Sequence, residues 1–157
     1  MSDKLIKRIA LKQEQLNRLI DTHRSLLAQC ALQRPNDIEL SALGFFLHSF
    51  YSGLENIFKR IAIEIDGALP QGEAWHRQLL DGMAAANEVR TAVISAALYD
   101  TLSEYLAFRH VVRQSYSFHL QWEKMAALVL NCEATMRSVE DELRVFSKDS
   151  SEMLAKN

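Results

Sequence analysis

One stretch of the sequence, Phe108 to His119, gathers side chains that could act on a phosphodiester. It holds two arginines, two histidines and one tyrosine and no acidic residue, although the whole chain has a formal net charge of −2. A guanidinium group presents a planar fork of donors to phosphate oxygens, and a histidine with a pKa near neutrality can carry a proton. Cleavage of RNA without a metal ion needs a base for the ribose 2′-hydroxyl, an acid for the leaving 5′-oxygen, and positive charge on the phosphate.

The same residues also have a purely structural interpretation. Cationic side chains near a helix C-terminus interact favourably with the helix dipole and its free carbonyl groups, and Tyr116 could be a half-buried ring with its hydroxyl at the surface. The phosphodiester interpretation requires available guanidinium groups at Arg109 and Arg113. It fails if these groups are buried in ion pairs or lie on unrelated surfaces.

Helical periodicity predicts the elements that must position this stretch. Apolar residues recur at helical spacing over Asp3–Gln33 and Ile38–Asp66, which predicts two long helices separated by a break at Arg34–Asp37. The second apolar stripe is broad and rich in aromatic residues, so this helix should be the central one. Gly44 and Gly53 lie within it. They indicate either close approach of a neighbouring helix or second subunit, or two tolerated weak positions.

Local signals fix where the helices begin. Ser2 or Asp3 can cap the first helix and Asp37 the second. A breaker run follows the second helix, and either Ser95 or Asp100 can cap the fourth. The later segments are expected to be a short helix over Glu73–Ala86, an irregular connection over Asn87–Ser95, a fourth helix reaching Tyr116, and a last helix over Gln121–Phe146 before a polar tail.

The predicted fold class is therefore an all-α, up-and-down bundle of four long helices plus one short helix. Residues 1–147 should form a single domain, and residues 148–157 a flexible polar tail. Cys30 and Cys132 belong to no metal or redox motif and are expected to be reduced core residues. No apolar stretch approaches the about 18 residues of a membrane span, so a cytoplasmic protein is expected.

Most standard sites have no support in the sequence. Dinucleotide, nucleoside triphosphate, zincin and hydrolase motifs do not occur, and we expect neither a cofactor nor a metal ion. His23, His48 and His76 are isolated in sequence, and the first two should be ordinary half-buried ring donors. The negative net charge gives no overall attraction to nucleic acid, so any RNA contact must be local.

The order of residues in the arginine-rich stretch resembles the HEPN superfamily, specifically its HepT-like toxins. Their motif is an arginine, four residues, a histidine, one residue and a tyrosine; here Arg109 and Tyr116 match its two ends. The segments Leu43–Phe58 and Trp75–Leu80 resemble parts of a HepT-like group from cyanobacteria and other bacteria. The three segments occur in the same order, and the similarity covers about residues 40–146.

This resemblance implies a metal-independent endoribonuclease toxin that forms a homodimer, with its motif residues in a cleft between subunits. It also implies a minimal nucleotidyltransferase antitoxin, which would neutralise the toxin by transferring AMP to Tyr116. Apolar residues on more than one face of the second helix, such as Phe45, Phe46 and Phe50, favour a dimer, although they could instead face the fifth helix.

The sequence departs from the family motif at one position. Gln114 stands where the family has histidine, and a glutamine cannot exchange a proton near neutral pH. His110 could serve instead, or Arg113 and His119 could supply a motif of permitted spacing. Alternatively, the nuclease activity is lost and the chain is an inactive module that binds a nucleotidyltransferase partner or a nucleotide, or it is a plain structural bundle. The imidazole that lies closest to Arg109 should distinguish between His110 and His119.

Overall fold

The computed structural model describes residues 1–114 and 120–156, except for the side chains of Arg113, Gln114 and Leu154. Over these residues the chain is all-helical, which confirms the predicted fold class. None of the described helices is long and apolar enough to cross a membrane. The elements are α1 (Asp3–Cys30), α2 (Asp37–Ile61), the π-helical turn η1 (Ala62–Asp66), α3 (Trp75–Ala84), α4 (Ala96–Gln114), α5 (Trp122–Leu130) and α6 (Cys132–Ala155).

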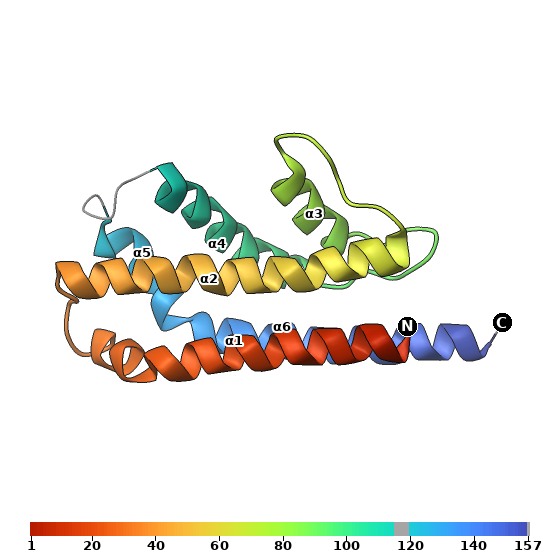
Figure 1. Ribbon diagram of the computed structural model, residues 1–157, viewed down its shortest axis with the longest axis horizontal. Helices are drawn as coiled ribbons and strands as arrows, with labels where there is room; N and C mark the ends of the chain where they lie inside the picture. The colour runs from red at the N-terminus through yellow and green to blue at the C-terminus, as the bar shows by residue number, and fades with distance from the viewer. Residues whose placement is uncertain (115–119, 157) are drawn as a thin grey trace.

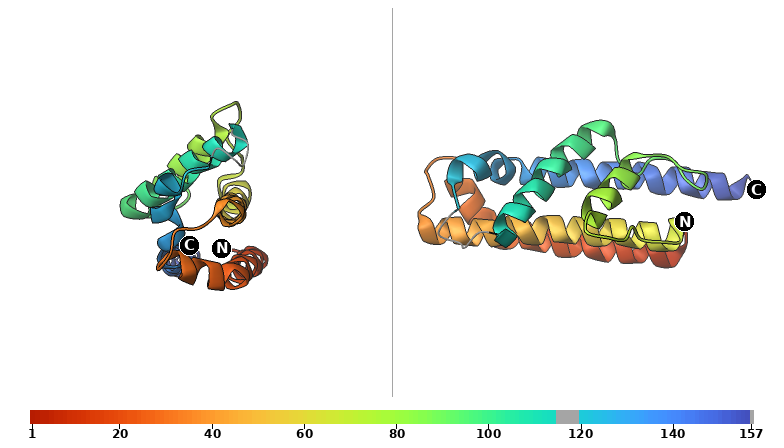
Figure 2. Two further views of the ribbon diagram at one scale, coloured as in Figure 1. Left: turned by 90° about the vertical axis from the view of Figure 1, so that its left-hand side faces the viewer. Right: turned by 90° about the horizontal axis from the view of Figure 1, so that it is seen from above.

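Helix α2 lies in the middle of the bundle and positions the other elements. In Figure 1 it runs between α1 and α6 on one side and α3 and α4 on the other, and the end view in Figure 2 shows the same grouping. Helix α2 contacts α1, α3, α4 and α5. Its core residues are fully buried, as its broad apolar stripe predicts; they are Leu43, Phe46, Phe50, Leu54, Ile57 and Phe58.

The predicted N-cap residues are correct for two of the three helices for which a cap was predicted. Ser2 and Ser95 each accept a hydrogen bond from the backbone N–H three residues later, so serine is the cap where the sequence offered two candidates. The prediction that Asp37 caps α2 is wrong, because the cap is Asn36. Asn36 accepts from the backbone N–H of Glu39, and the Glu39 carboxylate accepts from the N–H of Asn36. This reciprocal capping box satisfies two backbone donors.

The glycines of α2 show why the helix can pack so closely. A Cβ atom at Gly53 would overlap the Leu16 side chain of α1, and one at Gly44 would lie 2.6 Å from Leu120. Of the two alternatives left open for these glycines, the structure supports close approach, and the neighbouring segments belong to the same chain. At the end of η1, Gly67 adopts a φ of 83°, in the left-handed region that favours glycine.

The C-terminal part differs from the prediction of one helix ending at Phe146. The helix divides at Asn131 into α5 and α6, which gives the bundle a second short helix. At the break the buried Tyr105 hydroxyl donates to the Leu128 carbonyl (2.7 Å), whose regular helical partner would be the N–H of Cys132.

Helix α6 also continues to Ala155, through most of the residues expected to form a tail (Figure 1). The hydroxyls of Ser147 and Ser151 donate to carbonyls four residues earlier. The hydroxyls of these two serines are therefore satisfied within the helix.

Arg90 holds the irregular connection between α3 and α4. Its Nε and one terminal nitrogen donate to the two oxygens of Asp66 at 2.7 and 2.8 Å. Its remaining donors bond the carbonyls of Gly82, Ala85 and Thr91. The side chain of Arg90 is 3% exposed. It fixes the loop whose Val93 and Ile94 are buried against the bundle, as expected for this stretch.

Candidate functional site

Three helices each contribute one side chain to a buried polar cluster of Glu55, His76 and Arg109. Glu55 lies on α2, His76 in the first turn of α3, and Arg109 near the end of α4. The side chains of Glu55, His76 and Arg109 are only 4%, 11% and 13% exposed. Because Glu55 is a carboxylate in the apolar core of α2, it needs these partners to be buried at all.

The three side chains share hydrogen bonds. Nδ1 of His76 lies 2.6 Å from Oε2 of Glu55, and one terminal nitrogen of Arg109 donates to both Glu55 oxygens at 3.1 and 3.3 Å. That same arginine nitrogen lies 2.7 Å from Nδ1 of His76. A ring nitrogen carries either a hydrogen or a lone pair. Nδ1 can therefore donate to Glu55 or accept from Arg109, and the state of the His76 ring decides which bond forms.

A second imidazole lies beside this cluster. His110 is exposed and follows Arg109 directly on α4. Its ring centroid is 6.4 Å from that of His76, and the two rings are perpendicular. The cluster thus brings together one buried imidazole held by a carboxylate and one exposed imidazole. Two imidazoles at this separation can act as a base and an acid on one bound group.

A buried tyrosine accompanies Glu55 on α2. Tyr51, one turn before Glu55 on α2, is 1% exposed. Burial raises the pKa of the Tyr51 hydroxyl well above its usual value, and the negative charge of Glu55 raises it further. This hydroxyl therefore stays protonated and adds no charge to the cluster.

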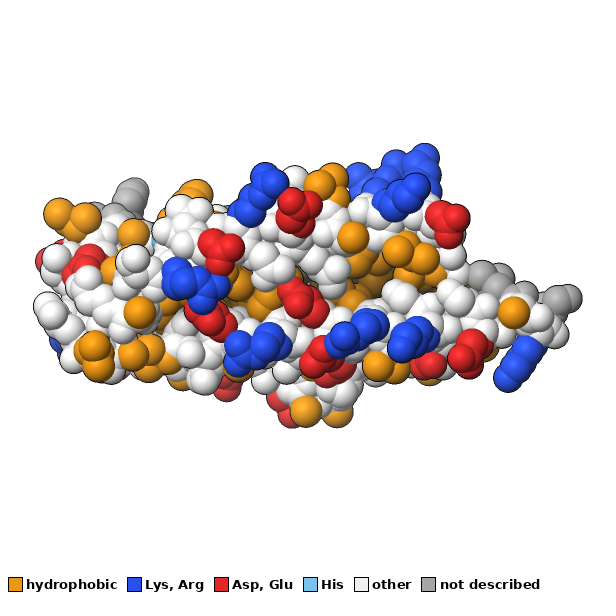
Figure 3. Space-filling model, turned by 90° about the horizontal axis from the view of Figure 1, so that it is seen from below, with side chains coloured by type: hydrophobic (Ala, Val, Ile, Leu, Met, Phe, Trp, Pro, Cys, Tyr) orange, Lys and Arg blue, Asp and Glu red, His pale blue; other side chains and the backbone are white. Residues whose placement is uncertain are grey.

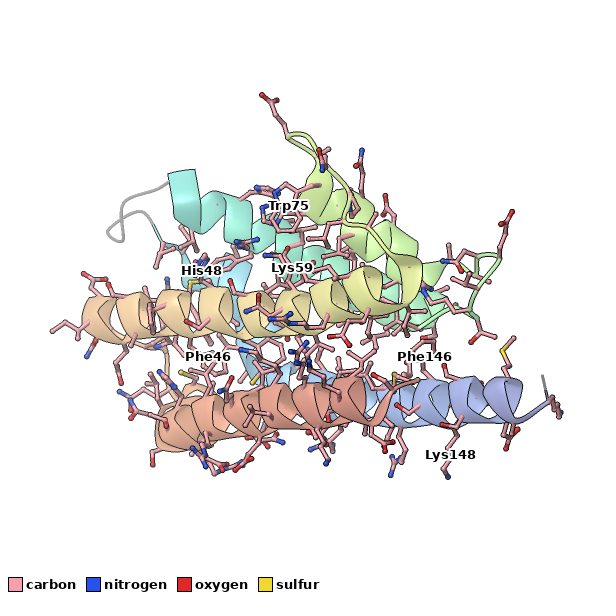
Figure 4. The ribbon with its side chains drawn as sticks, turned by 45° about the vertical axis from the view of Figure 1, so that its right-hand side comes forward. Phe46, His48, Lys59, Trp75, Phe146 and Lys148 are labelled. Atoms are coloured by element: carbon pink, nitrogen blue, oxygen red, sulfur yellow. The ribbon has the colours of Figure 1, made fainter. Side chains whose placement is uncertain are left out.

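The outer layer consists of one aromatic and one cationic residue. The Trp75 ring is stacked on His76 with 3.7 Å between centroids, and the Lys59 ammonium lies over the indole, 4.6 Å from its centroid. Figure 4 shows Trp75 of α3 and Lys59 of α2 facing each other on the side of α2 that carries α3 and α4.

The structure brings together only part of the predicted site. Arg109 and His110 lie in or beside the cluster, but Arg109 is held in a largely buried ion pair with Glu55, which is the condition under which the phosphodiester interpretation fails for this residue. Arg109 therefore does not supply the free guanidinium that the interpretation requires, and positive charge on a phosphate would have to come from another residue. Arg113 and Gln114 belong to the last turn of α4, and their side chains lie outside the described residues. The candidates Tyr116 and His119 also lie outside the described residues.

Sequence reasoning missed Glu55 and His76. A signal existed for Glu55, because an acidic residue next to Leu54 within the core stripe of α2 must find a buried partner. His76 gave no signal of its own, since it is separated from Glu55 and Arg109 by 21 and 33 residues. The other two isolated histidines are half-buried, as expected, and Nδ1 of His23 lies 2.8 Å from the Leu19 carbonyl.

Other concave surfaces lie elsewhere. A groove of about 560 Å³ between α1 and α6 has Ile6, Ile9 and Leu143 among its lining residues and contains no residue of the cluster. Figure 3 shows the hydrophobic side chains on this face, between charged residues of the two helices. Among the described residues, no group of three or more His, Cys, Asp or Glu side chains could hold a metal ion.

Comparison with known proteins gives one match. The model of a family described as HepT-like protein matches residues 42–150, which is more than half of the chain and includes Glu55, His76 and Arg109. No curated protein and no solved structure matches the sequence significantly.

Proposed function

Because the chain belongs to the HepT-like protein family of the HEPN superfamily, we propose that it is the toxin of a toxin–antitoxin pair and acts as a metal-independent endoribonuclease. The observation that carries this proposal is the pair of imidazoles, His76 and His110, whose centroids lie 6.4 Å apart beside Arg109. These imidazoles supply the proton carriers that Gln114 cannot supply.

The proposed reaction transfers two protons. When Nδ1 of His76 donates to Glu55, Nε2 carries the lone pair and can accept the proton of the ribose 2′-hydroxyl. The 2′-oxygen then attacks phosphorus, and the bond from phosphorus to the 5′-oxygen breaks. Protonated His110 gives its proton to that leaving oxygen. The products are a 2′,3′-cyclic phosphate and a 5′-hydroxyl end.

Arg109 and Glu55 act in this scheme as positioning residues. The charge of Arg109 is largely offset by Glu55, so Arg109 serves less as a free phosphate clamp than as a donor that holds the Glu55 carboxylate. Glu55 in turn accepts from Nδ1 of His76 and orients the ring. The positive charge that faces the phosphate then comes mainly from protonated His110 at the surface.

Cleavage of purified cellular RNA tests the proposal directly. We expect His76→Asn and His110→Asn each to lower the rate by at least about 100-fold, which is the contribution of one acid or base. Arg109→Ala should also abolish cleavage and growth arrest while the helical circular-dichroism signal stays intact. His23→Asn is the matched control, because His23 bonds its own helix away from the cluster. The proposal is wrong if the wild-type protein cleaves no cellular RNA.

A second candidate function is a non-catalytic module that binds a nucleotidyltransferase. Two observations favour it: Gln114 stands at the motif histidine position, and Arg109 is engaged in a buried ion pair. In this case expression of the protein alone causes no growth arrest, but it still co-purifies with a minimal nucleotidyltransferase encoded beside its gene. Growth arrest by the wild type and survival of the His110→Asn strain would favour the nuclease.

The antitoxin in the first proposal is a minimal nucleotidyltransferase that transfers AMP from ATP to Tyr116. The tyrosine oxygen forms a bond to the α-phosphorus of ATP, and pyrophosphate leaves. This assignment rests on the motif position of Tyr116, two residues after Gln114. The added group would bring bulk and negative charge to the arginine-rich stretch and so oppose RNA binding. Incubation with the partner and ATP should add the mass of one AMP to the wild type and to Tyr99→Phe, but not to Tyr116→Phe.

We also propose a homodimer, in the cytoplasm where the RNA and the partner are found. Phe46 and Phe50 are buried in the core of their own chain, so they do not supply the expected surplus surface. Phe45 is 65% exposed, and Ile38, two turns earlier on α2, is 82% exposed. Light scattering should give the mass of two chains for the wild type and of one chain for Phe45→Asp.

A further inference from the structure

We propose that Trp75 and Lys59 form a subsite for one unpaired nucleotide of single-stranded RNA, next to the scissile phosphate. The base stacks on the Trp75 indole, and the Lys59 ammonium pairs with the phosphate of that nucleotide. This inference rests on the proposed ribonuclease function and states how that site would hold its substrate.

The indole of Trp75 is held in place from behind. Trp75 is half-buried at the first residue of α3, and its ring stacks on His76 at 3.7 Å. His76 in turn lies 2.6 Å from Glu55, a buried residue of the central helix. A rigid aromatic surface of this kind binds nucleobases of any sequence, because every base has a π-face.

The other component of the subsite is cationic and movable. Lys59 follows Glu55 by one turn on α2, so its flexible side chain starts on the same face as the cluster. Its ammonium now lies 4.6 Å from the indole centroid. A nucleobase can replace the ammonium on the ring, since stacking on tryptophan is the stronger contact at a partly exposed site. The displaced ammonium then lies within reach of the phosphate of the stacked nucleotide.

The position of the subsite suits a strand that enters the reaction site. The stack from Trp75 to His76 and the 6.4 Å step from His76 to His110 form a continuous path from the indole to the exposed imidazole. A base stacked on Trp75 therefore brings its neighbouring phosphate towards the two imidazoles. Bases in a duplex are already stacked on each other, so the subsite should select single strands.

The chain offers a direct test, because it has only two tryptophans, Trp75 and Trp122. In the Trp122→Phe variant the fluorescence reports on Trp75 alone. The probe is a short single-stranded oligoadenylate with 2′-O-methyl groups throughout, which cannot be cleaved by attack of a 2′-hydroxyl. We expect saturable quenching of Trp75. The affinities of the variants are measured by fluorescence anisotropy of the same oligonucleotide carrying a fluorescein label, and we expect a loss of roughly tenfold in Trp75→Leu and a smaller loss in Trp75→Phe.

The lysine is tested by the salt dependence of the same binding. Removing one phosphate contact should lower the slope of log affinity against log salt by roughly 0.7 for a single strand. We expect this change in Lys59→Ala. Lys148→Ala is the matched control, since Lys148 is an exposed lysine of α6 on the far side of the bundle (Figure 4). Lys59 is only half-buried, so Lys59→Ala should fold. This variant therefore still tests the subsite if Trp75→Leu fails to fold.

The outcomes separate this inference from the proposed function. If the wild type cleaves RNA but Trp75→Leu and Lys59→Ala leave the KM unchanged and the indole is not quenched, the subsite is wrong and the nuclease stands. Equal binding of a duplex probe also overturns the subsite. If the indole is quenched and the salt slope depends on Lys59 but no RNA is cleaved, the subsite stands and the nuclease is wrong.

Discussion

Arg90 is buried and Arg109 is half-buried, and the two arginines differ in how many of their guanidinium donors are hydrogen-bonded. Arg90 makes five side-chain hydrogen bonds, two of them to Asp66, through all three guanidinium nitrogens. Arg109 bonds Glu55 and His76 through a single terminal nitrogen. The buried Nε of Arg109 has no hydrogen-bond partner among the described residues.

This difference indicates different roles. A buried polar group without a partner costs stability, so natural proteins rarely keep one where structure is the only requirement. All three guanidinium nitrogens of Arg90 are hydrogen-bonded, which fits a structural role in fixing the connection between α3 and α4. Within the part of the chain that the structure describes, Nε of Arg109 has no partner, and one terminal nitrogen contacts both Glu55 and Nδ1 of His76. A functional role is one explanation for a buried polar group that the fold leaves without a partner.

The largest expected effect on stability comes from replacing Arg90, whose guanidinium nitrogens are all hydrogen-bonded. Arg90→Met removes both bonds from Arg90 to Asp66, which keeps only its bond from Asn87, and takes a donor from three carbonyls. We expect a loss of about 3–5 kcal/mol in the free energy of unfolding. Urea denaturation measures it. Arg24→Met, which removes an exposed pair with Asp21 and Glu133, is the control and should change stability little. A small effect of Arg90→Met would contradict the distinction between the two arginines.

Arg109→Met should destabilise the protein less, by about 1–3 kcal/mol. After this change His76 can still hold the Glu55 carboxylate by donating from Nδ1, so the buried charge keeps one partner. RNA cleavage should nevertheless be lost. Urea denaturation and the cleavage assay on the same preparation test both statements. A loss of stability as large as that of Arg90→Met would assign Arg109 a structural role.

A double-mutant cycle should show which arginine is coupled to the imidazole. Arg109→Met and His76→Asn share a contact, and we expect a coupling free energy of about 0.5–3 kcal/mol. Arg90→Met and His76→Asn share none and should add to within about 0.5 kcal/mol. Unfolding of the two single variants and the double variant in each cycle gives these values. Equal coupling free energies in both cycles would show that His76 is not coupled specifically to Arg109.

The smallest effect concerns the acid stability of the Arg90 pair. Burial by itself raises the pKa of Asp66, but hydrogen bonds from Arg90 and Asn87 and the charge of Arg90 together lower it below its usual 3.8. A carboxyl group whose pKa is lowered on folding stabilises the protein above its unfolded pKa and loses that contribution as the pH falls through the folded value.

The difference in stability between the wild type and Asp66→Asn should therefore be constant from neutral pH down to about pH 5 and shrink below the unfolded pKa near 4. Urea denaturation over this pH range measures the difference. A difference that stays unchanged at the lowest pH at which the wild type remains folded would contradict the shift.

Much of the fold could be predicted because its signals are local. Apolar spacing identified the helices, and serine caps and the breaker run marked several of their limits. The errors occurred where a contact distant in sequence altered a local preference. The division at Asn131 coincides with the bond from Tyr105 to Leu128, which lie 23 residues apart.

The candidate site was predicted only in part. Arg109 and His110 belong to a contiguous motif and were found by their order in the sequence. Glu55 and His76 were not found, because neither has a neighbour in sequence that marks it as functional. Their roles depend on partners that the chain brings together only by folding.

The sequence by itself determined the helical class, the HepT-like family and the order of residues around Arg109, since each of these depends on spacing along the chain. The tertiary structure decided the partners of Arg109. Residues 55, 76 and 109 meet because α3 and α4 both pack on α2, and this packing depends on the whole core rather than on any local signal. That arrangement joined the Arg109 guanidinium to Glu55 in an ion pair and placed the His76 ring beside both side chains.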